Sequence, residues 1–375
     1  MKKKLSRQIS LFSDAVKNSD INLSAAASKG KKIIGYFCTN TPLEVIHASG
    51  FLPVRITGTY GNLESADSLV PVFTCPYMRT AIEKGLNNGF DYLSGIVNGY
   101  SCDAACGLVN IWENNIKGEI YHTIPLPYSD GTDSRRFYRS MIANLAEKLN
   151  SIGGKFSEGR LAESSALYGK IRNFLILLYE KRMKGELDLS AHEFYTVVRA
   201  GFITPPEDYF PMIEELINIL ESGNRENKKD TGVPVLVSGS VIDDSAIFGI
   251  IEESGGRIAA DDLCTGWRSF QPAFGSGHDP IEQVIDRYMN KSVCPARGRA
   301  ADRFAGMKMT LRESDSRGVI FVFQKFCTPH FADQPILKDE LKSIGIPSTV
   351  IEIEETGIHT GQARTRIESF IELLR

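Results

Sequence analysis

Several familiar signatures are missing from this sequence of 375 residues. It has no C-x-x-C pair, which argues against zinc ribbons and thioredoxin-like dithiols. It has no G-x-x-x-x-G-K-[ST] sequence, so any ATP that the function needs must be hydrolysed by another protein. Its formal net charge of −3 provides no general attraction for nucleic acids or acidic membranes, and we expect neither as a partner.

Long hydrophobic runs are missing as well. No segment approaches the roughly 18 uninterrupted apolar residues that span a membrane. The basic residues 1–4 are not followed by a sustained apolar stretch, so we expect no secretory signal and a cytoplasmic location. In that reducing compartment, and with an odd count of seven cysteines, we expect free thiols and not a disulfide framework.

The cysteines are the most informative residues that are present. Five of the seven are followed directly by Thr, a helix N-cap residue, or by Pro, which is favoured at the first helical position. The pattern therefore predicts thiolates at turn–helix junctions, where the positive end of the helix dipole favours them. Because thiolates bind soft metals and iron–sulfur clusters, a metal cluster is the first hypothesis. The seven are Cys38, Cys75, Cys102, Cys106, Cys264, Cys294 and Cys327.

The first third of the chain alternates between strands and helices. Apolar runs predict strands over residues 33–37, 51–57 and 92–97. Met78, Ile82 and Leu86 recur every fourth residue, which predicts a helix over residues 76–87, and another helix is expected after Cys102. Residues 41–44 (Thr-Pro-Leu-Glu) read as a capping box with Pro at the first helical position.

The rest of the chain is helical in the middle and alternating at the end. A helical period dominates residues 134–224, with a second capping box at 190–193, and the polar run 221–232 predicts a linker. Three regions are therefore expected: an α/β domain over residues 1–133, a helical region over 134–230 and an α/β domain over 231–375. The last domain is expected to have strands at 234–238, 257–260, 319–323 and 347–353, and helices at 243–254, after Cys327 and at 361–375.

The expected topology also says where a site should form. In open parallel sheets, ligands bind beyond the carboxyl ends of the strands. Four cysteines follow predicted strands, namely Cys38, Cys102, Cys264 and Cys327. If the two α/β domains face one another, these cysteines can meet in one cleft, as ligands of an iron–sulfur site between domains must. We expect Cys75, Cys102 and Cys327 to be ligands and Cys106 to be a small buried hydrophobic residue.

Three other features have more than one interpretation. His330 could act as a general acid or base, although a solvated or core histidine is favoured. Asp261 and Asp262 are either a carboxylate pair near the site or part of a turn or helix cap. Residues 275–277 (Gly-Ser-Gly) lack the third glycine of a dinucleotide fingerprint and are expected to form a loop.

Short stretches in the right order carry a family resemblance that extends over nearly the whole chain. These are residues 35–39 (Gly-Tyr-Phe-Cys-Thr), Cys75 with its helix, 101–103 (Ser-Cys-Asp), 261–266 (Asp-Asp-Leu-Cys-Thr-Gly), 325–327 (Lys-Phe-Cys) and 361–368. Together they resemble the catalytic component of the 2-hydroxyacyl-CoA dehydratases. The wider family includes the cluster subunits of benzoyl-CoA reductase.

The resemblance implies a fold, a cofactor and a reaction. The fold has two flavodoxin-like domains with an inserted helical region. Three cysteines, matching Cys75, Cys102 and Cys327, bind a [4Fe–4S] cluster between the domains and leave one iron open. The implied activity is that of a lyase: a 2-hydroxyacyl-CoA loses water through a ketyl radical and becomes an enoyl-CoA. The implied partners are a related second subunit and an ATP-dependent iron–sulfur activator that delivers one electron.

Cys38, Cys264 and Cys294 keep alternatives open. They also resemble positions of the double-cubane cluster proteins, in which six cysteines carry an [8Fe–9S] cluster in a homodimer that reduces small molecules. The stretch 261–268 (Asp-Asp-Leu-Cys-Thr-Gly-Trp-Arg) looks more like the dehydratases. A benzoyl-CoA-reductase-like subunit and a pure electron carrier are further alternatives, and the resemblance does not identify the acyl group or the proton-transfer base.

Overall fold

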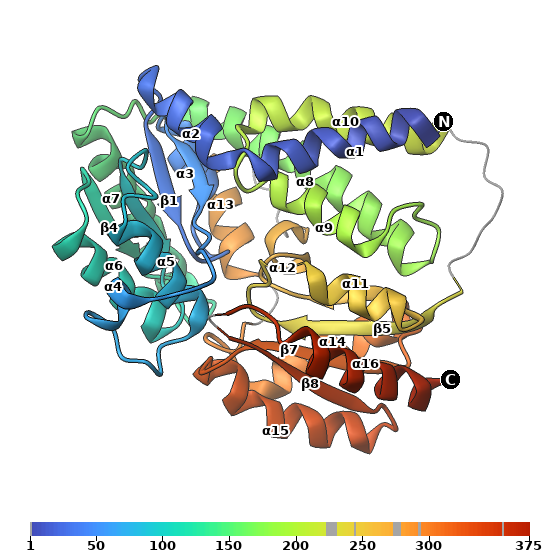
Figure 1. Ribbon diagram of the computed structural model, residues 1–375. Helices are drawn as coiled ribbons and strands as arrows, with labels where there is room; N and C mark the ends of the chain where they lie inside the picture. The colour runs from blue at the N-terminus through green and yellow to red at the C-terminus, as the bar shows by residue number, and fades with distance from the viewer. Residues whose placement is uncertain (1, 223–230, 244, 273–278, 292–293, 355) are drawn as a thin grey trace.

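The computed structural model describes residues 2–222, 231–243, 245–272, 279–291, 294–354 and 356–375, and Figure 1 shows its arrangement. Two sheets occupy two lobes, and long helices from the middle of the chain lie together with the N-terminal helix on one side. The predicted linker at 221–232 falls largely outside the described residues, and the predicted loop at 275–277 does so entirely.

The N-terminal sheet is parallel throughout, with strand order β2-β1-β3-β4. The three strands expected from apolar runs are confirmed, because β1, β2 and β3 are buried along their whole length. No apolar run indicated β4, whose three central residues are only half-buried. The strands are β1 (Ile33–Tyr36), β2 (Leu52–Arg55), β3 (Gly95–Gly99) and β4 (Ile120–Ile124). The helices are α3 (Leu43–Ala48), α4 (Glu64–Asp67), α5 (Pro76–Leu86) and α6 (Asp103–Asn115).

The C-terminal sheet repeats this plan with the order β6-β5-β7-β8, again all parallel. All four of its strands and the helices expected at 243–254, after Cys327 and at 361–375 are confirmed. The strands are β5 (Val233–Gly239), β6 (Gly256–Asp262), β7 (Gly318–Gln324) and β8 (Ser348–Ile353). The helices are α11 (Ala246–Glu253), α12 (Trp267–Phe270), α13 (Pro280–Met289), α14 (Ala300–Glu313), α15 (Thr328–Ser343) and α16 (Thr360–Leu374).

The middle of the chain is helical, as expected. The capping box at 190–193 is confirmed: the Ser190 hydroxyl accepts from the Glu193 N–H, and the Glu193 carboxylate accepts from the Ser190 N–H. Apolar residues from 171 to 217 share one core with the C-terminal sheet, whereas those from 138 to 149 pack in the core of the N-terminal sheet. The helices are α7 (Thr132–Ser151), α8 (Glu158–Met183), α9 (Ala191–Ala200) and α10 (Pro206–Ser222), with α1 (Lys2–Lys17) packed against α9 and α10 and followed by α2 (Ser19–Ser28).

The expected capping box at 41–44 is wrong. Helix α3 begins at Leu43, so Pro42 is the N-cap and not the first helical residue. The Thr41 hydroxyl accepts from the Gly99 N–H at 2.8 Å and so ties two strand ends together. The Glu44 carboxylate is buried and pairs with Arg172 at 2.5 Å, because a charge in this interior needs a cationic partner more than the helix needs a cap.

One helix connects the two halves. Ile285 and Tyr288 of α13 pack in the core of the N-terminal sheet, beside Ile34 and Tyr138. Helix α13 therefore belongs to the C-terminal half in sequence but packs with the N-terminal half. The domain boundaries expected at 133/134 and 230/231 stay predictions. None of the described helices is both long enough and apolar enough to cross a membrane.

The fold class predicted from the sequence is confirmed. The chain has an α/β fold with two flavodoxin-like domains, each a four-stranded parallel sheet flanked by helices. In each sheet the first strand of the half lies between the second and the third, so successive connections leave in opposite directions. Such a reversal opens a crevice at the carboxyl ends of the strands, which is where ligands bind in folds of this kind.

Candidate functional site

A cavity at these carboxyl ends collects six of the seven cysteines. Its empty volume is about 600 Å³, including the space that opens to solvent. Segments that follow strands of both sheets line it, so it lies between the two α/β domains. The prediction that cysteines distant in the sequence line one cleft is confirmed, whereas their role as ligands stays a prediction. The N-terminal half contributes Cys38, Cys75 and Cys102, and the C-terminal half contributes Cys264, Cys294 and Cys327.

Three of these cysteines are helix N-caps. Cys75 precedes α5, Cys102 precedes α6 and Cys327 precedes α15, with Pro76 and Pro329 in the first turns of their helices. Phe326 has a φ of 61°, a left-handed conformation that an aromatic residue rarely takes. This residue turns the chain out of β7 so that Cys327 can begin the helix.

The other cysteine–Thr and cysteine–Pro pairs do not cap helices, which corrects the prediction from sequence. Cys264 lies in the turn after β6, and α12 begins only at Trp267 with Gly266 as its N-cap. The Thr265 hydroxyl accepts from the Ile242 N–H at 3.2 Å and so fastens this turn to the one after β5. Helix α14 after Cys294 has Arg299 as its N-cap.

The expected thiolate character is also wrong for the free thiols. Burial raises the pKa of Cys75 to about 12 and that of Cys102 to about 11, and it raises the pKa of Cys327 well above the usual value. Backbone N–H groups at the helix starts lower each pKa, but by less than burial raises it. The free thiols are therefore protonated at neutral pH, and a metal must displace their protons.

Besides burial, the thiols influence one another across the cavity. Residues 75, 102 and 327 form a first trio by their predicted role, and negative charge on Cys75 and Cys102 raises the pKa of Cys327. Residues 38, 264 and 294 are the remaining trio: burial raises the pKa of Cys294 to about 12, Arg268 opposes the rise, and Cys264 and Cys38 add to it. The two trios are coupled, because Cys38 also raises the pKa of Cys102 and Cys264 that of Cys327.

These thiols fit a cluster better than a single ion. Among the described residues, no three His, Cys, Asp or Glu side chains are grouped closely enough to hold one metal ion. In a cubane each thiolate binds a different iron, so the ligands of a cluster lie farther apart than those of one ion. Phe37, Met78 and Val241 also line the cavity and would shield such a group from water.

Basic side chains surround the cavity: two buried arginines and the half-buried Lys291. Arg55 is 2% exposed and donates from Nη1 to the Cys264 carbonyl at 2.9 Å. Lys291 donates to the Thr39 carbonyl at 2.6 Å; burial and then Arg287 lower its pKa well below the usual value, while Cys38 opposes them. Buried positive charge requires a negative partner, and thiolates bound to iron would provide one.

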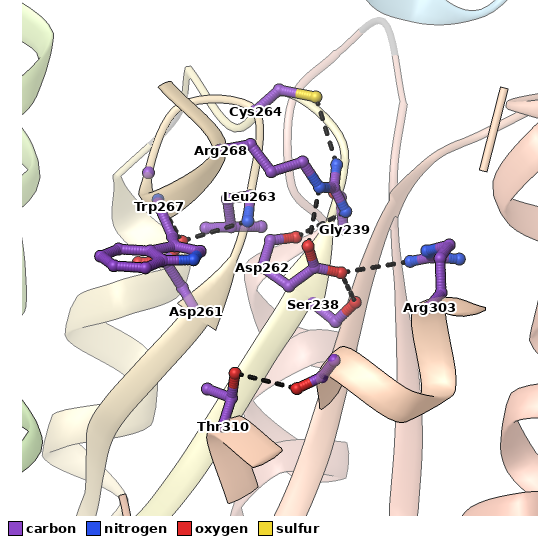
Figure 2. A network of polar contacts seen from close by, with 12 residues as sticks. Ser238, Gly239, Asp261, Asp262, Leu263, Cys264, Trp267, Arg268, Arg303 and Thr310 are labelled. Carbon is purple, nitrogen blue, oxygen red and sulfur yellow. Dashed lines mark hydrogen bonds and ion pairs between the residues drawn. The ribbon is translucent and has the colours of Figure 1, made fainter. Parts of the chain in front are cut away.

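Figure 2 shows Arg268, which donates hydrogen bonds from all three of its guanidinium nitrogens. Its Nη1 donates to the Cys264 sulfur at 3.3 Å, and its Nε donates to the Asp262 carboxylate at 2.7 Å. The same carboxylate accepts from Ser238 at 3.0 Å and from Arg303 at 3.2 Å. Arg268 is 2% exposed, so this network holds a guanidinium in a fixed position against the sulfur.

The two neighbouring aspartates therefore have different roles. Asp261 accepts from the Leu263 N–H at 3.1 Å, the Trp267 N–H at 2.8 Å and the Tyr195 hydroxyl at 2.9 Å. These bonds shape the turn that carries Cys264, which confirms turn chemistry for Asp261. Burial raises the pKa of Asp261 to about 6, although these bonds lower it. Asp262 instead forms the ion pairs described above.

His330 and Cys106 occupy different surroundings. His330 lines the cavity from α15 and is 3% exposed, with its ring 5.1 Å from that of Phe323. Burial, Arg268 and Arg303 lower its pKa well below the usual value, so the ring is neutral. A core histidine fits this placement, and an acid–base role stays a prediction. Cys106 lies one turn beyond Cys102 on α6 and is not among the residues that line the cavity.

The sequence analysis missed the cations of the site. Arg55, Arg268 and Lys291 were given no role, yet all three contact the cysteine segments. One signal was available for Arg55, because it is a charged residue in the apolar run 51–57. A charge inside a buried strand usually has a specific partner or ligand.

Two α/β domains with six cysteines in the cavity between them define the class: an α/β protein with a cysteine-lined site between its domains. Comparison with known families then identifies the group within that class. The chain belongs to the family described as 2-hydroxyglutaryl-CoA dehydratase, D-component, whose profile matches residues 38–374. This confirms the resemblance read from the sequence.

Relatives of known name are similar over their full length but distant. The chain is 24% identical over 369 residues to the (R)-phenyllactyl-CoA dehydratase beta subunit of Clostridium sporogenes, covering 97% of each chain. It is 24% identical over 374 residues to one subunit of the benzoyl-CoA reductase of Thauera aromatica, covering 95% of each. It is 23% identical over 368 residues to the (R)-2-hydroxyglutaryl-CoA dehydratase subunit beta of Acidaminococcus fermentans, covering 94% of this chain and 95% of the relative.

Proposed function

We propose that this protein is the iron–sulfur subunit of a 2-hydroxyacyl-CoA dehydratase, a lyase that removes water from a 2-hydroxyacyl-CoA to give an enoyl-CoA. The observation that carries the proposal is the cavity in which Cys75, Cys102 and Cys327 come together between the two domains. Membership of the dehydratase D-component family supports the reaction class, and the 23–24% identity to named relatives leaves the acyl group open.

Cys75, Cys102 and Cys327 would hold a [4Fe–4S] cluster by their sulfurs. Such a cluster, when bound, supplies one-electron chemistry and an iron that can act as a Lewis acid. The chain itself contributes the rest: apolar residues such as Phe37 and Val241 exclude water, and Arg55 and Arg268 offset negative charge.

The proposal includes two protein partners. A related second subunit is supported by the relatives, which are themselves named as subunits of larger enzymes. An ATP-dependent iron–sulfur activator is needed because the reaction requires one electron at low potential and the sequence has no phosphate-binding loop. The activator would deliver that electron and the acyl-CoA would be the substrate.

A second candidate is a double-cubane reductase of small molecules. One observation favours it: Cys38, Cys264 and Cys294 line the same cavity as the first trio, and Arg268 already contacts the Cys264 sulfur. Six cysteines would then hold an [8Fe–9S] cluster. The sequence 261–268 and the named dehydratase relatives favour the first candidate.

Anaerobic reconstitution separates the candidates. The dehydratase predicts about four irons per chain and an absorption change when a 2-hydroxyacyl-CoA is added. It also predicts enoyl-CoA formation once the second subunit, the activator and ATP are present. About eight irons per chain and no response to thioesters supports the double cubane. About four irons with no response to any acyl-CoA supports an electron carrier and contradicts the proposed enzyme.

A further inference from the structure

A second cavity lies outside the cysteine site, where α9 packs between α1 and α11 (Figure 1). We refer to it as the helix cavity. Its empty volume is about 790 Å³, including the space that opens to solvent, which is within the range of about 300–1,000 Å³ for small-molecule sites. The turn after β5 separates it from the cysteines: Ser240 and Val241 line the cysteine cavity, whereas Ile242 and Asp243 line the helix cavity. None of its described lining residues is a cysteine, so the proposed cluster leaves it free.

Basic side chains line the helix cavity from two helices. They are Lys17, the last residue of α1, and His192 and Arg199 of α9. Lys17 and His192 are exposed, and in the described part of the chain neither has an ion-pair partner. Arg199 is half-buried, and its Nη1 donates to the Asp243 carbonyl at 2.8 Å. This bond holds the guanidinium in place, and among the described residues Nε and Nη2 have no hydrogen-bond partner.

Positive charge outweighs negative charge around this cavity. Asp243 is the one carboxylate among its described lining residues. Burial raises the pKa of Asp243, and Arg199 and then Arg55 lower it, so two guanidinium groups already act on this single carboxylate. Lys17 adds a further positive charge, and His192 adds one when it is protonated. A cavity with such a surplus attracts an anionic ligand.

The helix cavity also has an apolar surface. Val16 of α1, Ile242 and Phe248 of α11 provide it. The Phe248 ring stacks on Tyr195, with ring centres 3.9 Å apart and an interplanar angle of 17°, which fixes its orientation. An apolar surface with an aromatic ring accepts the face of a planar base, and the neighbouring cations accept phosphate. A nucleotide combines these two parts in one small molecule.

We propose that the helix cavity binds a nucleotide, with the base against Val16 and Phe248 and the phosphates on Arg199 and Lys17. Arg199 provides fixed, charge-assisted donors, and Lys17 adds an exposed point charge. The ligand is either a free nucleotide or the nucleotide part of a CoA thioester, because both present a base and phosphate groups. The inference goes beyond the proposed function, and it requires neither the cluster nor the dehydration reaction.

Four probes test the assignment, namely ADP, adenosine, pyrophosphate and acetyl-CoA. Each is titrated without oxygen into the cluster-loaded protein, and its affinity is measured by calorimetry. ADP is expected to bind at least about tenfold more tightly than adenosine or pyrophosphate, because it alone of these three reaches both the apolar surface and the cations. If acetyl-CoA binds more tightly than ADP and depends on Arg199, the nucleotide is that of CoA. If ADP alone depends on Arg199, the ligand is a free nucleotide.

Two substitutions locate the bound nucleotide. Arg199→Gln is expected to weaken ADP binding at least about tenfold, because charge-assisted hydrogen bonds to phosphate are lost. Lys17→Gln is expected to weaken it about threefold, because an exposed charge contributes less, and this exposed side chain can be changed without disturbing the core. Arg7→Gln is the matched control. It removes an exposed charge from α1 outside the cavity and should change the ADP affinity less than about twofold.

The outcomes separate this inference from the proposed function. Binding of ADP no tighter than that of adenosine, or equally tight binding of ADP and pyrophosphate, overturns the nucleotide assignment. An ADP affinity that is unchanged in both Arg199→Gln and Lys17→Gln overturns the helix cavity as the binding site. Either result leaves the dehydratase proposal standing, because iron loading and enoyl-CoA formation are measured separately. Absence of iron loading and enoyl-CoA formation, with ADP binding as expected, contradicts the proposed function and supports this inference.

Discussion

The two α/β halves have the same strand order and each contributes three cysteines to one cavity, but they surround those cysteines differently. In the N-terminal half, Cys75 and Cys102 begin helices and lie against an apolar cluster with Phe37 and Trp112. In the C-terminal half, Cys264 lies on a turn fixed by buried ion pairs. Cys264 also packs against that apolar cluster, so the C-terminal half differs by the charge it adds and not by a lack of apolar shielding.

The largest effect is expected when a predicted ligand cysteine of either half is replaced. Cys75→Ser or Cys102→Ser on one side, and Cys327→Ser on the other, should each lower bound iron from about four per chain to below about one, because a serine oxygen is a poor ligand for a cubane iron. Iron and acid-labile sulfide are measured after anaerobic reconstitution. Cys106→Ser is the matched control and should retain its iron, since Cys106 does not line the cavity. Full loading of any of the three ligand variants would contradict the assignment.

The ion-pair network of the C-terminal half should be the next most sensitive feature. Arg268→Gln leaves the Asp262 carboxylate, whose side chain is 21% exposed, with Arg303 as its remaining cation. Loss of a charge-assisted hydrogen bond typically costs about 1.5–3 kcal/mol, so the metal-free protein should lose about that much free energy of unfolding in a urea titration. Arg299→Gln removes an exposed pair with Asp302 and should cost less than about 1 kcal/mol. Equal losses in the two variants would show that the network contributes little.

The N-terminal half contains the buried carboxylate of Glu44, and its contribution to the stability of the fold depends on pH. Burial raises the pKa of Glu44, but Arg172, Arg287 and the Tyr288 hydroxyl outweigh burial and lower it from 4.5 to about 2. The ionised carboxylate therefore stabilises the fold fully above about pH 4.5, and this contribution is lost as the pH falls toward about 2.

Glu44→Gln tests that dependence. The variant should lose about 3 kcal/mol of unfolding free energy at neutral pH, and its difference from the wild type should shrink as the pH falls below 4.5. Glu253→Gln, which removes an exposed pair with Arg364, serves as the control and should be nearly neutral. A difference that is constant across this pH range would exclude the Glu44 charge as its origin.

The smallest expected effect distinguishes the two cluster candidates. Arg268→Lys keeps the positive charge but weakens the fixed N–H donor to the Cys264 sulfur. If Cys264 binds iron, losing this hydrogen bond should make the reduction potential more negative, because donors to ligand sulfur stabilise the reduced cluster. If only Cys75, Cys102 and Cys327 bind iron, the potential should hardly change. An electrochemical titration of both proteins measures the difference.

Much of the fold could be predicted because its strands are buried on both faces and read as apolar runs. This holds for β1, β5 and β7, all of whose residues are mostly or fully buried. Apolar runs do not reveal β4, whose central residues are half-exposed, or α1, which buries only three residues. The capping box at 41–44 was mistaken because its Thr and Glu have long-range partners that a local pattern cannot reveal.

The site could be predicted to the extent that topology determines it. Cysteines that follow strands must lie at the carboxyl edge of a parallel sheet, and this placed Cys102, Cys264 and Cys327 near one another. Arg268 lies only six positions from Asp262, but the other charge contacts around the cysteines could not be predicted, because they join residues that are distant in sequence. Asp262 and Arg303 are 41 positions apart, and Arg55 and Cys264 are 209 apart.

The central claim is that Cys75, Cys102 and Cys327 bind iron, and locating iron directly in crystals tests it best. The measurement is anomalous X-ray scattering at the iron absorption edge, on crystals grown without oxygen from the reconstituted protein. The account predicts strong iron peaks bonded to the sulfurs of Cys75, Cys102 and Cys327, within the cavity between the two domains. Loaded crystals in which those three sulfurs have no iron within bonding distance would contradict it.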